Sequence, residues 1–355
     1  MIKSTFRLTL FSIALFITAS HSADAALDGL ATAEPISRTR PMMGTQVTIT
    51  ASLSHLGESE LLACMDEAFA EIDRIETVMS EYIPASEISV ANREAGSSPV
   101  AVGRELADLV RLGLEISRLS DGAFDISFAG MNRLWDFGNP EGPLPTRDEA
   151  AAAVRHVDYR KIVLAGNDPP TISFKDPEMK LGLGAIAKGY GVDRAMEALH
   201  RCGATDAIVN AGGDLKASGR CGERPWRIGI QDPREMSRLV ATIIVEDFAV
   251  VSSGDYERYF IRDGKRYHHI LDPRTGMPAR GSSSVTVLHQ SAARADALAT
   301  AIFVLGPERG MALINSIPGE AVIIDIRGEI TLSEGLVWEK GTEIILRQKM
   351  GVDEQ

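Results

Sequence analysis

Apolar residues recur with helical spacing in three segments of the chain. The longest segment covers residues 58–80, where one face carries Leu62, Met65, Phe69, Ile72, Ile75 and Met79. This spacing predicts an amphipathic helix, and we interpret its apolar face as part of the core. A second helix is predicted over residues 106–119, before the break at Ser120-Asp121-Gly122. A capping box of Thr146 and Glu149 opens a third helix on the alanine run that follows.

Other segments alternate apolar and polar residues, as strands do. The first covers residues 43–52, with Val47, Ile49 and Ala51 on one face. Short strands are predicted over residues 208–210, 227–231 and 239–245, and hairpins at Asp263-Gly264 and Arg327-Gly328. Hairpins interspersed with helices predict an α+β fold, with mixed or antiparallel sheets and flanking helices, rather than a strict βαβ alternation.

The N-terminus has the pattern of a targeting signal. Lys3 and Arg7 precede an apolar stretch over residues 8–19, and Ala23-Asp24-Ala25 offers small residues for cleavage. The stretch is short for a membrane span, which needs about 20 residues. We predict a cleaved Sec-type signal peptide over residues 1–25, a flexible leader over residues 26–40 and a periplasmic mature protein. An uncleaved anchor is the alternative.

Composition narrows the function classes. The chain has 355 residues, of which 45% are hydrophobic, so it can bury a sizeable core. Its net charge of -12 argues against nucleic acid as a partner, and an anionic ligand would need local cations. There are three cysteines, Cys64, Cys202 and Cys221, and no C-x-x-C motif. Cys202 and Cys221 could pair in an oxidising compartment, but the sequence does not decide this.

The run from residue 267 to residue 306 carries the most chemistry. His268 and His269 precede a turn, Asp272-Pro273-Arg274-Thr275-Gly276. A helix capped by Ser291 and stopped by Gly306 follows, and it places Asp296 and Thr300 one turn apart. This helix is apolar nearly all round, so Asp296 is expected to be buried and to need a partner. A carboxylate beside a hydroxyl suits a hard cation such as Mg²⁺.

A glycine-rich segment over residues 181–191 is the second candidate site. It matches the dinucleotide pattern G-x-G-x-x-A only formally, because the strand before it would be very short and the next strand begins only near Ile208. It is not a Walker loop, since Gly189 follows Lys188. The segment offers backbone N–H groups at a helix start, and Lys188 for phosphate.

Together these segments resemble the ApbE family of flavin transferases, over about residues 43–306. Any one motif would be weak support, but seven occur in the expected order: Met42-Met43-Gly44-Thr45, Tyr82-Ile83-Pro84-Ala85-Ser86-Glu87-Ile88, Gly122-Ala123-Phe124-Asp125-Ile126-Ser127, Gly184-Ala185-Ile186-Ala187-Lys188-Gly189-Tyr190, Asn210-Ala211-Gly212-Gly213-Asp214, His269 to Gly276, and Ala295-Asp296-Ala297-Leu298-Ala299-Thr300. The resemblance implies a single domain over residues 41–350 with an FAD cleft.

The family's activity is what the resemblance implies for this chain. With Mg²⁺ bound, FAD would be split at its pyrophosphate, FMN joined through a phosphoester to a threonine of an acceptor protein, and AMP released. By resemblance, the side chains of Asp296 and Thr300 and the carbonyl of Ala185 bind Mg²⁺, and Lys188 contacts the FAD phosphates. His269 is positioned to accept the threonine proton, with a structural role in the turn as the alternative. An ordinary imidazole would make the rate fall as the pH drops through about 6.5.

The resemblance also assigns residues to the flavin and adenine side: Met43, Tyr82, Ala123, Phe124, Asp125 and, next to His269, Ile270. Aromatic rings and a thioether suit a flat ring system, although each could be ordinary core. His268 is expected to face outward, because strand residues alternate. Asp272 and Thr275 are expected to hold the turn together, and residues 210–214 to form a tight turn that could face the ligand. Gly182 departs from the family, in which many members carry an aspartate.

Other functions stay open at this point. The nearest is a metal-dependent FAD pyrophosphatase that releases FMN and AMP, and the next is a non-catalytic flavin-binding or delivery protein. A Rossmann oxidoreductase is more distant. Family analogy suggests an acceptor among the exported domains of membrane electron-transfer complexes, but the sequence names neither the acceptor nor the oligomeric state.

Overall fold

A computed structural model describes residues 34–53, 56–131 and 134–347. The predicted signal peptide, residues 1–25, and residues 26–33 of the predicted leader lie outside the described residues. Within the described ranges, no helix combines the length and the apolar character that a membrane crossing requires.

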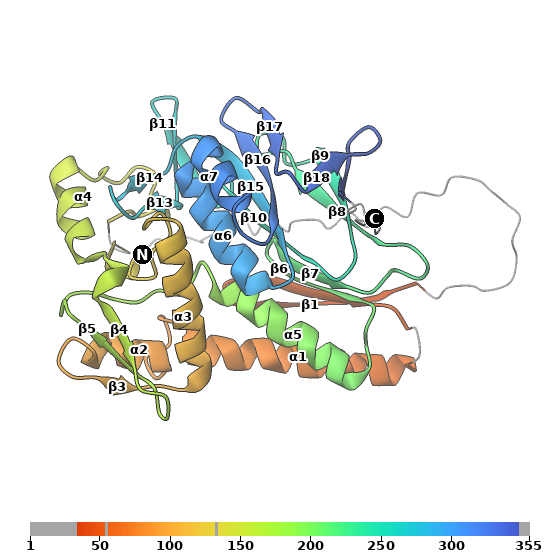
Figure 1. The fold of residues 1–355 in the computed structure, drawn as a ribbon, viewed down its shortest axis with the longest axis horizontal. Helices are drawn as coiled ribbons and strands as arrows, with labels where there is room; N and C mark the ends of the chain where they lie inside the picture. Colours follow the sequence, from red (N-terminus) through yellow and green to blue (C-terminus); the bar gives the residue numbers. More distant parts are fainter. Residues whose placement is uncertain (1–33, 54–55, 132–133, 348–355) are drawn as a thin grey trace, which may run out of the picture.

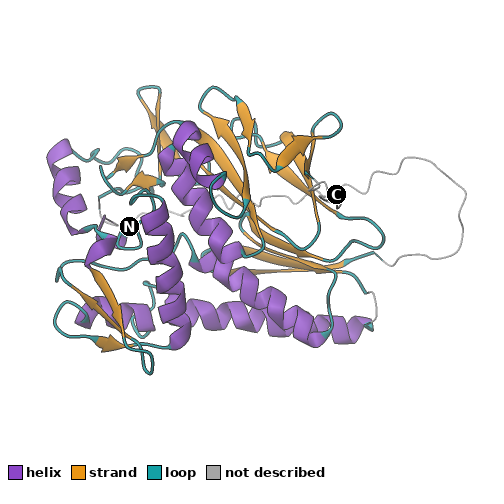
Figure 2. Cartoon of the chain, viewed as in Figure 1, coloured by secondary structure: helices purple, strands orange, loops and turns teal. Residues whose placement is uncertain are grey.

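An eight-stranded sheet forms the centre of the fold (Figures 1 and 2). All its neighbouring strands pair antiparallel. The strands lie in the order β1 (Ile36–Met42), β2 (Thr45–Ala51), β6 (Ala207–Ala211), β7 (Asp214–Ser218), β10 (Ala249–Gly254), β15 (Ser282–His289), β16 (Glu320–Asp325) and β17 (Ile330–Leu332).

Helices cover one face of this sheet and a second sheet covers the other. The helices are α1 (Glu58–Met79), α5 (Ala187–Cys202) and α6 (Ala292–Leu305), with α3 (Arg104–Leu119) against α6 and α7 (Pro307–Ile314) against α6 and β16. The second sheet has the order β18 (Leu336–Trp338), β19 (Glu343–Leu346), β9 (Leu239–Val245) and β8 (Trp226–Gln231).

The central sheet is apolar on both faces, because it separates two cores. Val209 and Val251 belong to the core under the helices, whereas their neighbours Ile208 and Val250 belong to the core under the second sheet. Successive strand residues point to opposite faces, so near-continuous apolar runs are needed where both faces are covered.

Smaller elements complete the fold at the left and at the top of Figure 1. They are α2 (Glu87–Glu94), α4 (Arg147–Ala153), the 3-10 turns η1 (Ala129–Met131), η2 (Val154–His156) and η3 (Tyr159–Lys161), a sheet of β3 (Val100–Ala101), β5 (Thr171–Phe174) and β4 (Ile162–Ala165), and the hairpins of β11 (Tyr259–Arg262) with β12 (Lys265–His268) and β13 (Leu271–Asp272) with β14 (Met277–Pro278). The predicted α+β fold is confirmed, and so is the capping box of Thr146 and Glu149.

Residues 36–40, which the sequence assigned to a flexible leader, form part of the strand β1 instead. This strand pairs with β2 over its whole length. Arg38 and Arg40 also reach across to Asp66 on α1, and the Arg38 contact measures 2.6 Å. These partners follow later in the chain, so the local pattern did not reveal the strand.

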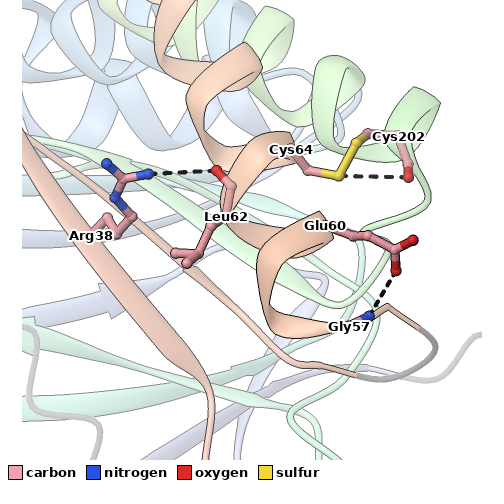
Figure 3. The surroundings of a disulfide bond; sticks show 6 residues. All are labelled: Arg38, Gly57, Glu60, Leu62, Cys64 and Cys202. Atoms are coloured by element: carbon pink, nitrogen blue, oxygen red, sulfur yellow. Dashed lines mark hydrogen bonds between the residues drawn. A yellow bond between two sulfur atoms is a disulfide. The ribbon is translucent and has the colours of Figure 1, made fainter.

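The disulfide joins Cys64 of α1 to Cys202 at the end of α5 (Figure 3). The pairing of Cys202 with Cys221 considered from the sequence is therefore wrong, and Cys221 is a free, partly buried thiol. The two helices pack along each other and bring the Cα atoms of Cys64 and Cys202 to 5.7 Å, although 138 positions separate them in sequence. Only the packing of α1 on α5 determines this pair.

Breaking this disulfide should lower the free energy of unfolding by about 2–4 kcal/mol, because the cross-link restricts the unfolded chain. Urea denaturation of the wild type with and without dithiothreitol measures the effect, and Cys64→Ala/Cys202→Ala should reproduce it. Cys221→Ala is the matched control, since it removes a thiol outside the bond. An unchanged midpoint on reduction would show that the bond does not stabilise the fold.

Candidate active site

The site begins where the first turn of α5 meets α6. A Cβ on Gly189 would lie 2.2 Å from the Ala292 carbonyl oxygen, so only glycine permits this close approach. The Gly189 N–H donates to the Asp296 carboxylate at 3.2 Å. Gly189 therefore lets the glycine-rich segment contact the helix that carries Asp296.

Asp296 is buried, with 3% of its surface exposed, as its apolar helix predicted. Burial, and then the neighbouring Asp214 carboxyl, raise its pKa. Asp214 begins β7 and is 2% exposed, and burial raises its pKa too, against the lowering effect of Lys188. Two buried carboxyls close together make a site that gains from an added positive charge.

Lys188 supplies part of that charge. Its ammonium forms an ion pair with Asp214. Burial alone would lower the lysine pKa, but Asp214 and Asp296 outweigh burial and raise it, so Lys188 is charged. With one ammonium and up to two carboxylates, the cluster remains able to attract a divalent cation.

The residues predicted to bind metal fit a hard cation. Thr300 lies one turn after Asp296 on α6, and its hydroxyl is 3.3 Å from the Ser253 hydroxyl on β10. Ala185 lies in the loop before α5, and within the described chain its carbonyl accepts no backbone hydrogen bond. Among the described residues there is no cluster of three or more His, Cys, Asp or Glu side chains suited to a metal. A cation here would therefore rely on carboxylate, hydroxyl and carbonyl oxygens, which Mg²⁺ prefers.

The two histidines lie the opposite way from the expected arrangement. His268 is buried: its Nε2 is 3.0 Å from the Ala279 carbonyl oxygen, and its ring meets the Phe303 ring of α6 edge-on. His269 is solvent-accessible, and its backbone N–H donates to the Arg258 carbonyl at 3.0 Å. The alternation of faces holds, but α6 lies on the His268 side, so His268 and not His269 faces the core.

His269 is held in its neutral form. Loss of solvation, and then the charge of Arg258, with further effects of His268 and Lys188, lower the pKa of His269 to about 3. The ring is itself exposed to water, so solvent screens the charges that act on it. The Lys188 charge is among those that act on His269, so the two side chains lie in the same part of the fold. The activity loss expected near pH 6.5 should therefore occur at a lower pH.

Arg258→Gln should raise the pKa of His269 toward 6.5, because it removes the largest of the charge effects on the ring. The expected rise is less than about one pH unit, since both groups are solvent-accessible and salt screens them. NMR titration of the His269 ring measures it, with Arg309→Gln on α7 as a control that also removes one exposed guanidinium. Identical titrations for Arg258→Gln and the wild type would contradict the assigned charge effect.

The residues predicted to line the flavin and adenine side divide into two groups. Met43 and Tyr82 lie in loops. Met43 has a left-handed φ of 50° between β1 and β2, and its N–H donates to Glu76 at 2.8 Å. Tyr82 is 84% exposed, and partial burial and then the Glu81 carboxylate raise its pKa, with a smaller lowering effect of Arg258.

The second group is buried: Ala123, Phe124, Asp125 and Ile270. Asp125 accepts from the Ser127 N–H at 2.8 Å, the Ser127 hydroxyl at 2.6 Å and the Tyr159 N–H at 2.9 Å. These bonds use both carboxylate oxygens to fix the loop. The Ile270 carbonyl accepts from the Ala279 N–H at 2.9 Å. Ligand contact by these residues stays a prediction.

At Gly182 the structure leaves no free space for a side chain. A Cβ there would lie 2.9 Å from Ala129, from the Phe128 ring and from the Glu81 carboxylate. Many family members are expected to carry an aspartate at this position, and here the Glu81 carboxylate lies beside Gly182.

Sequence reasoning did not assign three charged residues that reach the site: Asp214, Glu257 and Arg258. Asp214 ends the Asn210–Asp214 motif, which gave a usable signal. Glu257 is influenced by Lys188, Asp214 and Arg258, and burial raises its pKa. Glu257 and Arg258 follow β10 in a segment with no recognisable motif, so only the folded chain shows them.

Comparisons with known proteins identify the family of this chain. The ApbE family model matches residues 43–324. A curated FAD:protein FMN transferase from Treponema pallidum is 34% identical over 325 residues, covering 87% of this chain and 90% of that protein. One from Vibrio cholerae is 36% identical, covering 81% and 86%.

Solved structures show the same fold. The ApbE protein of Thermotoga maritima aligns with a TM-score of 0.76 at 32% identity, over 85% of this chain and 97% of that one. The flavin transferase ApbE of Vibrio cholerae aligns with a TM-score of 0.74 at 31% identity, over the same shares. With the family model matching most of its length, and with its fold and motifs in agreement, this chain belongs to the ApbE family.

Proposed function

We propose that this protein transfers FMN from FAD to an acceptor protein, through a phosphoester bond to a threonine, and releases AMP. The observation that carries the proposal is the buried cluster of Lys188, Asp214 and Asp296, whose ammonium also acts to keep His269 neutral. A proton acceptor beside a phosphate-binding cation is what phosphoryl transfer to a hydroxyl needs.

Each residue has a defined part in the reaction. The threonine oxygen forms a bond to the FMN phosphorus, and the phosphorus–oxygen bond to the AMP half breaks, with the electron pair leaving on AMP. His269 takes the hydroxyl proton at its free imidazole nitrogen. Lys188, at the start of α5, offsets negative charge on the pyrophosphate.

We place Mg²⁺ at Asp296, Thr300 and the Ala185 carbonyl. When bound there, it would neutralise charge on the phosphate oxygens. The burial of Asp296 beside Asp214 supports this assignment, because the pair gains from a cation. The pyrophosphatase and the flavin-delivery protein remain the competing functions.

Incubation with FAD, Mg²⁺ and a candidate acceptor, followed by mass spectrometry of the acceptor, tests the proposal. The expected result is an added FMN phosphoester on a threonine, with AMP in equal amount. FAD turnover at the same rate without any acceptor would identify a pyrophosphatase. FAD binding with no AMP release in either reaction would identify a delivery protein.

We further propose that the protein works in the periplasm, on an exported domain of a membrane electron-transfer complex. Two observations support export: the charged and apolar pattern of residues 1–25, and the disulfide between Cys64 and Cys202. Disulfides persist in oxidising compartments and are rare in the cytosol. An acceptor in the same compartment would meet the enzyme after export.

The mature protein should begin near Ala26, because the small residues at Ala23 to Ala25 suit signal peptidase. Intact mass measurement of the protein from its native host decides this. A species that retains Met1 and sediments with membranes would show that the segment is an anchor.

A further inference from the structure

Two depressions meet at Met277, beside the segment that carries His269. The larger has a volume of about 300 Å³ and lies between α4 and the Asp272–Gly276 turn, with Ala150, Val154 and Met277 among its lining residues. The smaller, of about 20 Å³, lies between β12 and the segment from Met277 to Arg280. Both are lined by Met277, and we call the surface that the two depressions line the basic groove.

The basic groove borders the residues on both sides of His269. Ala279 lines the smaller depression. Its N–H donates to the Ile270 carbonyl at 2.9 Å, and its carbonyl oxygen is 3.0 Å from His268 Nε2. Anything held in the groove therefore lies next to the strand end that presents His269.

The charge of the groove contrasts with that of the whole protein. Its described lining contains no acidic residue and five basic ones, Arg147, Lys265, Arg266, Arg274 and Arg280, although the chain has a net charge of -12. Such a concentration of cations attracts an acidic partner, and the effect is strongest at low salt.

Some of these cations already have partners, and others do not. Arg274 pairs with Asp272 at 2.7 Å, and Arg266 lies 3.9 Å from Asp255. Among the described residues, no carboxylate pairs with Arg147, Lys265 or Arg280. The nearby acids of the first turn of α4 are partly engaged, since the Glu149 carboxylate accepts from the N–H and the hydroxyl of the N-cap residue Thr146, both at 2.8 Å. Arg147 and Arg280 therefore remain available, whereas the Lys265 ammonium lies over the Tyr267 ring, 4.9 Å from its centroid.

We infer that the basic groove docks an acidic, extended segment of the acceptor protein, close to the residue that receives FMN. The inference rests on the proposed transferase function and specifies the partner of that site. A polypeptide fits better than FAD, since the larger depression is at the lower limit of the roughly 300–1,000 Å³ of small-ligand pockets. The apolar side chains of Ala150, Val154 and Met277 would contact an apolar residue of this segment. The basic side chains of the groove would contact its acidic residues.

The test uses a labelled synthetic peptide in which Asp and Leu alternate around one Thr, together with two matched peptides carrying Asn or Lys in place of Asp. Fluorescence anisotropy measures their binding to the full protein. The variant Arg147→Glu/Arg280→Glu reverses two unpaired charges. The control Arg309→Glu/Lys340→Glu makes the same change in net charge at exposed positions outside the groove.

Binding of the Asp peptide to the wild type and to the control should be similar, and about tenfold weaker to the groove variant at low salt. The Lys peptide should gain affinity for the groove variant. Equal binding of the Asp and Asn peptides to the wild type, or equal binding of the Asp peptide to all three proteins, would overturn the inference. Charge-dependent binding of phosphatidylglycerol vesicles, without peptide binding, would assign the groove to a membrane instead.

FAD binding, measured on the same proteins, distinguishes a failure of the docking inference from a failure of the proposed transferase function. It should be the same in all three, because no altered residue belongs to the Lys188 and His269 site. Loss of the peptide effect with normal FAD binding counts against the groove alone. Normal peptide selectivity with no FAD binding or AMP release counts against the proposed transferase function alone.

Discussion

Asp296→Asn should lower FMN transfer by about 100-fold to 1,000-fold while the fold stays intact, since a bound metal supplies several kcal/mol of charge stabilisation. The amide lacks the charge that a hard cation needs. Its oxygen can still accept the Gly189 N–H, which the carboxylate accepts at 3.2 Å. Calorimetry measures Mg²⁺ binding to the FAD-loaded variant, and single-turnover kinetics measure its rate of FMN transfer. Unchanged Mg²⁺ binding would show that the metal lies elsewhere.

Thr300→Ala is the graded comparison for this prediction. It removes one neutral oxygen that water can replace, so transfer should fall by less than in Asp296→Asn. Both positions lie on the same face of α6. An equal or larger loss in Thr300→Ala would contradict the assigned ligand roles.

The unfolding free energy of the metal-free protein provides a second readout of Asp296. Its folded-state pKa lies above the usual aspartate value, because of burial and Asp214. The folded protein therefore holds more protons than the unfolded chain between the two pKa values, and its stability falls as the pH rises through that window. Asp296→Asn should weaken this pH dependence, and urea denaturation across the window measures it.

His269→Ala should reduce transfer by about 100-fold to 10,000-fold and leave FAD affinity similar, because it removes a proton acceptor. Single-turnover formation of the flavinylated acceptor, at saturating FAD, measures the loss. Added imidazole should restore part of the rate in the variant. Near-normal transfer would leave His269 with a structural role and move the base to another group such as Asp272.

His268→Ala is not a suitable control for His269→Ala, although the outward position expected from the sequence would have made it one. Its ring is buried against Phe303, and its Nε2 contacts the Ala279 carbonyl oxygen. His268→Ala should therefore destabilise the protein, by the loss of packing and of a buried polar contact. His200→Ala, at the exposed end of α5, is the better control for removal of an imidazole, although it loses the contact of its Nε2 with the Ser218 hydroxyl at 2.7 Å.

The sequence alone determined the elements whose signals are local. Ser291 caps α6 by accepting from the Arg294 N–H, and the helix ends at Gly306, as the pattern predicted. The apolar face of α1 and the burial of Asp296 also followed, because helical spacing assigns each residue to a face. Seven short motifs in order were enough to indicate the family and its fold.

The tertiary structure decided every feature that joins distant segments. It placed Asp214 beside Lys188 and Asp296, brought Arg258 to His269, joined Cys64 to Cys202, and made residues 36–40 a strand by pairing them with β2. It also buried His268 in place of His269, because α6 packs on that side of the hairpin. Local patterns record which face a residue occupies, but which face is covered depends on contacts that form only when remote parts of the chain pack together.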